Sequence, residues 1–92
     1  MPLIKSPSQL GAVLRATRTA LNLPAADVAA MTGTSAVSLR RLEDGNATSA
    51  MQTLFALLDE LGIEMHLAPP PQVGPIELPA TGGKPKRTRV RL

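Results

Sequence analysis

The chain has 92 residues and no cysteine, which fits one small intracellular, cytoplasmic domain without disulfides or a zinc site of the usual ligand type. A chain this short buries only about 60–65% of its unfolded surface, and Phe55 is its one aromatic residue, so an isolated monomer is expected to be marginally stable. Oligomerisation is the expected way to stabilise such a chain. The sequence has no apolar run of about 18 residues and no charged-then-apolar leader, so we predict neither a membrane span nor a secretory signal.

The net charge of +3 is divided unevenly along the chain. Residues 1–68 carry five basic and six acidic side chains, whereas residues 69–92 carry five basic side chains and one acidic. The basic residues of this last segment are Lys84, Lys86, Arg87, Arg89 and Arg91. If the folded part binds nucleic acid, it must therefore do so through a few placed arginines and backbone amides rather than a broad basic field.

A first helix is predicted to begin after Ser6. Ser6 suits the N-cap, Pro7 the first helical position, and Gln9 the third position of a capping box. The sequence Asn22-Leu23-Pro24 ends this helix, because the residue before a proline disfavours the α region. One apolar stripe follows the helical period: Leu10, Leu14, Thr17 and Leu21.

Residues 24–45 read as two short helices joined by a tight turn at Gly33. Pro24 suits the first position of the earlier helix, Ser35 is a ready N-cap for the later one, and Gly45 suits a left-handed C-cap. The expected apolar positions are Val28, Ala29 and Met31 in the first helix and Leu39 and Leu42 in the second. The lengths of the two helices and the positions of the turn and cap residues are those of a helix-turn-helix, whose second helix lies in the DNA major groove.

A fourth helix is predicted from a cap at Thr48 or Ser49 to about Leu61, where Gly62 stops it. Its apolar residues cover more than one face: Met51, Leu54, Phe55, Leu57, Leu58 and Leu61. The period then changes from about 3.6 to 2, which predicts a strand with Ile63, Met65 and Leu67 on one face.

No other segment alternates convincingly, so this single strand is predicted to pair with its copy in a second subunit. The dimer interface would also cover the extra face of the fourth helix, and its predicted residues are Leu57, Leu61, Ile63, Met65 and Leu67. We therefore expect a mainly α domain over residues 1–68, with four helices and one short strand. Residues 69–92, rich in proline and basic side chains, are expected to be a flexible tail. That tail could add non-specific DNA affinity, dock on an acidic partner, or be a protease-accessible end.

The central stretch resembles the helix-turn-helix of the lambda-repressor-like regulators of the Cro and XRE type, over residues 7–62. The matching features are Leu21 to Leu23, the spacing of Ala29 and Gly33, Ser35, Leu39, Leu42 and the Arg-Leu-Glu-Asp-Gly close from Arg41 to Gly45. The resemblance implies a four-helix fold that binds double-stranded DNA.

The same resemblance assigns roles to individual residues. Ala36, Val37 and Arg41 would face base edges, with Ser35, Ser38 and Arg40 able to reach bases or phosphates. Asn46 and Thr48 lie where the family's loop approaches the DNA backbone, although turn and cap roles are an equal alternative. Arg18 and Glu43 are similar to a structural pair of the family, which would leave Arg15 freer to contact a phosphate. The chain departs from the usual pattern at Ala25, Ala36 and Val37, where polar residues are common, so specificity would depend more on Arg40, Arg41 and DNA shape.

The flanks narrow the resemblance to HipB-type antitoxins, through residues 6–10 and the Leu61–Leu67 strand. This likeness implies a homodimer that binds a palindromic operator, represses its own operon and neutralises a HipA-type kinase toxin. The alternatives are a stand-alone XRE-type regulator, or an interaction adaptor on the same fold with little DNA binding. We expect no enzyme activity, no cofactor and no metal site, because His66 has no second histidine or cysteine and no phosphate loop or nucleophile motif occurs.

Overall fold

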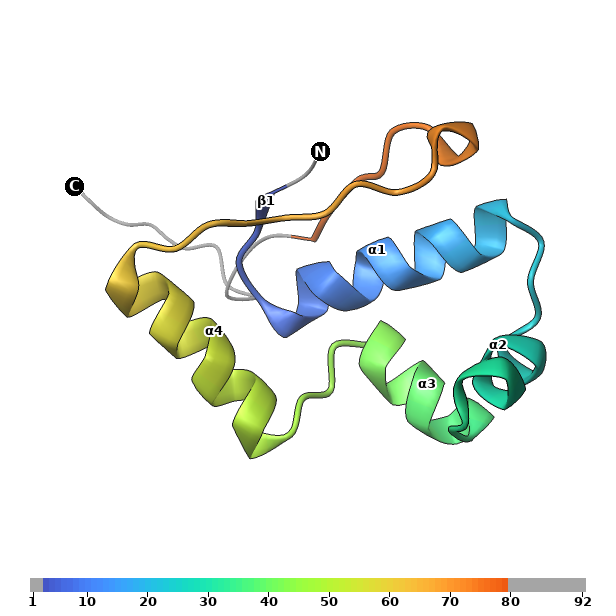
Figure 1. Ribbon diagram of the computed structural model, residues 1–92, viewed down its shortest axis with the longest axis horizontal. Helices are drawn as coiled ribbons and strands as arrows, with labels where there is room; N and C mark the ends of the chain where they lie inside the picture. The colour runs from blue at the N-terminus through green and yellow to red at the C-terminus, as the bar shows by residue number, and fades with distance from the viewer. Residues whose placement is uncertain (1–2, 80–92) are drawn as a thin grey trace.

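The computed structural model describes residues 3–79. In chain order, its elements are β1 (Leu3–Ile4), α1 (Pro7–Ala20), α2 (Ala25–Thr32), α3 (Ala36–Glu43), α4 (Ser49–Leu61), β2 (Met65–His66) and the short 3-10 helix η1 (Pro71–Val73) (Figure 1). The architecture is mainly helical, as the sequence predicts. Within the described residues no helix has the length and apolar character needed to cross a membrane.

Three of the four helices begin at a side-chain cap. Ser6, Ser35 and Thr48 each accept a hydrogen bond from the backbone N–H three residues later, at 3.2, 3.0 and 3.3 Å. The start of α2 differs from the prediction. Pro24 is its N-cap rather than its first helical residue, because its ψ of 146° is extended. Since proline has no N–H and its side chain cannot accept a hydrogen bond, α2 starts without a side-chain cap.

All four helices end with the same backbone motif, in which a residue one or two positions after the helix has a positive φ. These residues are Asn22, Gly33, Gly45 and Gly62. After α2, for example, Thr34 N–H donates to the Ala29 carbonyl at 2.9 Å and Gly33 N–H to the Ala30 carbonyl at 3.4 Å. This Schellman arrangement satisfies carbonyls that the helix leaves unpaired. The predicted turn at Gly33 and left-handed Gly45 are confirmed.

The apolar core consists of two clusters. The first contains buried Ile4, Val13 and Phe55, and a set of partly buried side chains packs on it: Leu10, Met51, Leu58, Met65, Leu67, Ile76 and Leu78. The second contains Ala25, Ala29 and Leu39 and lies between α2 and α3, with Val28 against it. The molecule therefore has one cluster for the helix-turn-helix and another that joins Ile4 to Ile76 and Leu78, near the two limits of the described residues.

Three residues expected in the apolar faces of α1, α2 and α3 are exposed, and so is Leu54 of α4, at 41%. Leu14 is 38% exposed, Met31 68% and Leu42 40%. On α1 the buried positions are instead Gln9, Gly11 and Val13. The buried face of α1 is displaced because the helix contacts α3 through Gly11, which has no side chain, rather than through the predicted leucines.

The strand prediction was wrong about the partner. β2 pairs antiparallel with β1 of the same chain, with Leu3 opposite His66 and Ile4 opposite Met65. The strand is also shorter than predicted, since only Met65–His66 is in the ladder and Ile63 and Leu67 lie outside it. Two residues are too few to show a period of 2, which is why Leu3–Ile4 gave no signal in the sequence.

Residues 69–79, which we term the strap, lie against the body of the molecule. Ile76 and Leu78 lie against the first cluster, and the Gln9 Nε2 amide donates to the Pro79 carbonyl at 3.0 Å. Figure 1 shows the chain after β2 running along α1, with η1 beside that helix. Residues after position 68 therefore contribute side chains to the first cluster. The basic residues from Lys84 to Arg91 lie outside the described residues.

Candidate nucleic-acid interface

The two central helices pack through small side chains. Ala25 and Ala29 of α2 and Leu39 of α3 are all at least nine-tenths buried. Alanine lets the two helix backbones approach closely, and Gly33 reverses the chain between them with a φ of 79°. The arrangement fixes the angle at which α3 leaves the turn.

One face of α3 points away from the body. Leu39 and Glu43 are buried and Ala36 is half-buried, so the residues on the opposite side are directed outward. Val37 and Arg41 lie one turn apart on this side, and Asp44 follows three residues later. Val37 is 58% exposed. We call Val37, Arg41 and Asp44 the outward line of α3.

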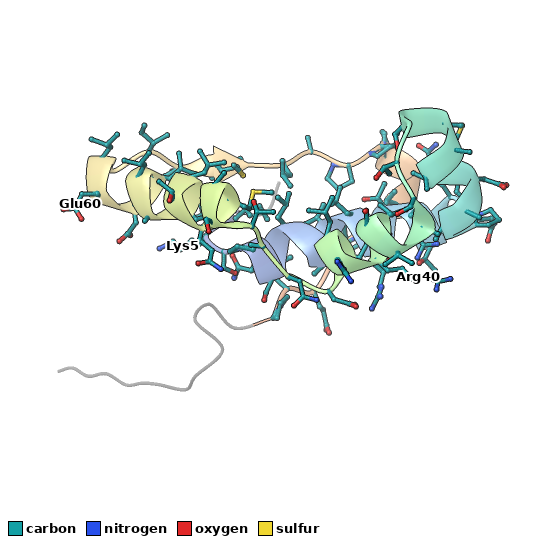
Figure 2. The ribbon with its side chains drawn as sticks, turned by 90° about the horizontal axis from the view of Figure 1, so that it is seen from below. Lys5, Arg40 and Glu60 are labelled. Carbon is teal, nitrogen blue, oxygen red and sulfur yellow. The ribbon has the colours of Figure 1, made fainter. Side chains whose placement is uncertain are left out.

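Arg40 and Arg41 are the basic residues of the last turn of α3, and both are exposed. Figure 2 shows Arg40 at the edge of the molecule, near the end opposite Glu60. Among residues 3–79, no carboxylate forms an ion pair with either arginine. Their position suits the negative end of the helix dipole and leaves both guanidinium groups able to meet a phosphate or a base edge.

Arg18 and Glu43, which the sequence analysis paired, form a bidentate ion pair between α1 and the end of α3. Arg18 Nε donates to Glu43 Oε2 at 2.6 Å and Arg18 Nη2 to Glu43 Oε1 at 3.0 Å. Arg18 Nη1 also donates to the Leu23 carbonyl at 2.9 Å, so the same side chain holds the linker before α2. Glu43 has a fully buried side chain. Hydrogen bonding from Arg18 lowers the pKa of Glu43 and raises that of Arg18, so both stay charged near neutral pH.

Arg15 is not left free for phosphate, contrary to the expectation from sequence. Its Nη2 donates to Asp44 Oδ1 at 2.9 Å, and its Nε lies 3.4 Å from Glu43 Oε1. One turn of α1 separates Arg15 from Arg18, so both side chains reach the same adjacent pair of acids at the end of α3. Sequence reasoning gave no role to Asp44.

A second feature missed in the sequence is the glycine inside α1. A Cβ on Gly11 would collide with the backbone carbonyls of Leu42 and Glu43, so α1 and α3 touch backbone to backbone there. A Cβ on Gly45 would likewise lie within 2.8 Å of Ser8 Cα. The available signal was Gly11 itself, because a glycine inside a helix is unfavourable by about 1 kcal/mol relative to alanine and so suggests a packing reason.

Among the other polar residues of the predicted interface, two side chains cap helices. Ser35 Oγ accepts from Ser38 N–H and also donates to Ser38 Oγ at 3.1 Å. Thr48 Oγ1 accepts from Met51 N–H. Asn46 has an exposed side chain, and its backbone N–H closes the end of α3 at the Arg41 carbonyl, 2.9 Å away. The structure thus gives cap roles to Ser35 and Thr48 and leaves the Asn46 side chain facing solvent.

The residues predicted for a dimer interface divide into two groups. Leu57, Leu61 and Ile63 are 51%, 66% and 54% exposed and form an apolar surface at the far end of α4. Met65 and Leu67 instead pack against the core of their own chain. The division arises because β1 turns that face of β2 into the core.

His66 lies 3.1 Å from Glu64 Oε1, and residues 3–79 contain no cluster of three side chains that could hold a metal ion.

Comparison with known proteins identifies one family. A family model described as a helix-turn-helix domain matches residues 9–67, more than half of the chain. The match runs from the first turn of α1 through β2 and includes both arginines of α3. No curated protein and no solved structure gives a significant match.

Proposed function

Because this chain belongs to the helix-turn-helix domain family, we propose that it is a sequence-specific repressor that binds double-stranded DNA as a homodimer. The observation that carries the proposal is the exposed side of α3. Val37 and Arg41 face outward one turn apart, and the buried Arg18–Glu43 pair holds the far end of the helix in place. An exposed helix fixed at both ends is what insertion into a major groove requires.

Base reading would depend on a few side chains. Arg40 and Arg41 can each make a bidentate contact to guanine, which contributes about 1–3 kcal/mol of discrimination when well placed. Val37 offers an apolar contact to a thymine methyl group, and the half-buried Ala36 a smaller one. Ser38 and Asn46 are exposed and could donate to phosphate oxygens. Sequence-dependent DNA shape would supply the remaining specificity.

The proposed dimer buries the apolar surface of Leu57, Leu61 and Ile63 against a second copy. Three large apolar side chains, each more than half exposed on one end of a small domain, support an intersubunit contact. A two-fold dimer would place one α3 in each half-site of a palindromic operator, about 34 Å apart. Met65 and Leu67 contribute to this interface indirectly, through the core beneath it.

We further propose that this repressor is the antitoxin of a toxin–antitoxin module with a HipA-type kinase toxin. The support is the likeness of residues 6–10 and 61–67 to HipB-type antitoxins, which the helix-turn-helix family alone does not provide. A stand-alone XRE-type regulator is the alternative. Co-expression with the protein of the adjoining reading frame tests the choice. Capture of a kinase-like protein at a fixed stoichiometry supports the antitoxin, and its absence supports the stand-alone regulator.

One observation favours a second candidate, an adaptor with little DNA binding. Residues 3–79 carry five basic and seven acidic side chains, and both arginines of α1 are engaged by carboxylates. An adaptor would bind its protein partner without salt-dependent affinity for DNA, whereas a repressor would lose affinity as salt rises.

The test uses the double variant Arg40→Ala, Arg41→Ala and a duplex from the region upstream of the protein's own reading frame. We expect the wild type to shift the duplex and the double variant to lose the shift while light scattering still reports a dimer. Lys5→Ala is the matched control, because Lys5 is an exposed cation located toward the end where Glu60 lies (Figure 2). Equal shifts by the wild type and the double variant would refute the site assignment.

A further inference from the structure

The end of α3 carries an exposed ion pair that differs in kind from the buried one beside it. Arg15 and Asp44 have side chains that are 51% and 50% exposed, and Arg15 Nη2 lies 2.9 Å from Asp44 Oδ1. The neighbouring Glu43 side chain is fully buried and that of Arg18 is 19% exposed. Solvent, and therefore another anion, can reach the Arg15–Asp44 pair, whereas the Arg18–Glu43 pair is closed off.

Asp44 also lies where a carboxylate is unfavourable for a DNA-binding helix. It follows Val37 and Arg41 on the outward line and is located at the negative end of the α3 dipole. Both DNA phosphates and the helix end would repel it. A favourable interaction must offset this repulsion, and Arg15 is the cation that the structure places there.

The surroundings of the pair can admit a phosphate group. An open groove of about 700 Å³ runs along α1 at this point, and its polar lining includes Ser8, Arg15 and Asp44. Besides these residues, the groove is lined by the small side chains of Ala12, Ala16 and Ala20 and by Thr19, Glu43 and Pro79. A backbone phosphate could therefore reach the Arg15 guanidinium without displacement of a large side chain.

We propose that Asp44 holds Arg15 as an internal competitor for DNA phosphate, and so weakens the contact of the protein with the DNA backbone. This inference rests on the proposed DNA binding by α3. In the free protein, Asp44 occupies one edge of the Arg15 guanidinium. On DNA, a phosphate replaces Asp44, and because the exposed pair is weak the exchange is possible but reduces the net gain. Overall affinity then depends more on base contacts than on phosphate contacts, which favours specific over non-specific binding.

The proposal predicts that removing the Asp44 charge strengthens non-specific binding through Arg15. The test compares four full-length variants: Asp44→Asn, Arg15→Gln, the double variant of both, and Glu60→Gln. Glu60 is the matched control for the loss of one negative charge, since it is exposed and lies at the opposite end of the molecule from Arg40 (Figure 2). The probe is a fluorescein-labelled duplex of mixed sequence, titrated from about 50 to about 200 mM salt. Thermal unfolding of each variant verifies the fold.

We expect Asp44→Asn to raise affinity for this duplex by about five- to tenfold at the low-salt end and to steepen the salt slope by about 1. Glu60→Gln should change affinity by less than about twofold, because Glu60 lies at the end of the molecule opposite Arg40 and salt screens its charge there (Figure 2). In the Arg15→Gln background, Asp44→Asn should gain no more than Glu60→Gln does.

Two results would overturn the inference. An equal gain from Asp44→Asn and Glu60→Gln would mean that only net charge matters. A gain that persists in the Arg15→Gln background would mean that Asp44 repels DNA directly. Failure of the proposed function is recognised separately, because the wild type would then fail to shift its upstream duplex in the presence of intact Arg40 and Arg41.

Discussion

Different interactions stabilise the two parts of this small protein, the helix-turn-helix and the part that contains the sheet. The first part, α2 and α3, packs on itself through alanines and is attached to α1 by two arginines, two carboxylates and a backbone contact at Gly11. The second part joins β1, α4, β2 and the strap around Phe55. Burial of apolar side chains stabilises the second part, whereas ion pairs and a close backbone contact position the first against α1. A chain with one aromatic residue can therefore orient the exposed helix α3 without a large core beneath it.

The largest effect is expected from Phe55→Ala. Phe55 is 7% exposed and is the largest side chain of the first cluster, so its removal leaves a cavity. We expect a loss of about 3–5 kcal/mol in the free energy of unfolding, measured by urea denaturation. Thr53→Ala, an exposed change on the same helix, should stay within about 0.5 kcal/mol. Similar losses for both variants would contradict the assignment of the core.

Two truncations test the strap. Ending the chain after Pro71 removes Ile76 and Leu78 from the first cluster and should lower the free energy of unfolding by about 2–3 kcal/mol. Ending it after Pro79 keeps both side chains and the Gln9 hydrogen bond and should leave stability within about 0.5 kcal/mol. Equal stability of the two shortened chains would show that the strap contributes nothing.

Gly11→Ala tests the contact between α1 and α3 by the sign of its effect. In a free helix this change stabilises by about 1 kcal/mol. Here the added Cβ meets the carbonyls of Leu42 and Glu43, so we expect a loss of about 1–3 kcal/mol in thermal or urea unfolding. Thr19→Ala on the exposed side of α1 is the control and should have little effect. A stabilised Gly11→Ala variant would rule out the backbone contact.

The smallest expected effect is the contribution of Glu43 to the change of the free energy of unfolding with pH. Because the pKa of Glu43 is lowered in the folded protein from its ordinary 4.5, the unfolded chain binds more protons in that range. The stabilisation is therefore complete above about pH 4.5 and is lost as pH falls toward the folded pKa. Urea unfolding of Glu43→Gln should show lower stability at neutral pH and a flatter decline below pH 4.5 than Glu60→Gln. Parallel curves for the two variants would contradict the assignment.

The helices were predictable because their signals are local. Ser6, Ser35 and Thr48 cap backbone groups three residues away, and Gly33, Gly45 and Gly62 end helices through bonds within five residues. These positions agree with the sequence analysis to within a residue. The buried face of α1 was predictable only in part, since Leu10 of the leucine stripe packs on the first cluster but Leu14 is exposed and the contact at Gly11 was not expected.

For the candidate site, the sequence located α3 and its two arginines but not the state of Arg15. The Arg18–Glu43 pair was expected from a family resemblance, and the structure contains it. Arg15 was expected to be free, yet Asp44, 29 positions later, engages it. The sequence could not show which arginine of α1 each acid engages, because the acids Glu43 and Asp44 are adjacent and both arginines lie within one turn of each other.

By itself, the sequence determined the four helices, the turn at Gly33 and the caps at the helix ends, because each depends on hydrogen bonds and periodicity within a few residues. Tertiary structure alone decided that β2 pairs with β1, that the strap reaches back 70 positions to Gln9, and that Asp44 occupies Arg15. Those contacts join distant segments, and only the packing of the whole chain brings them within hydrogen-bonding distance.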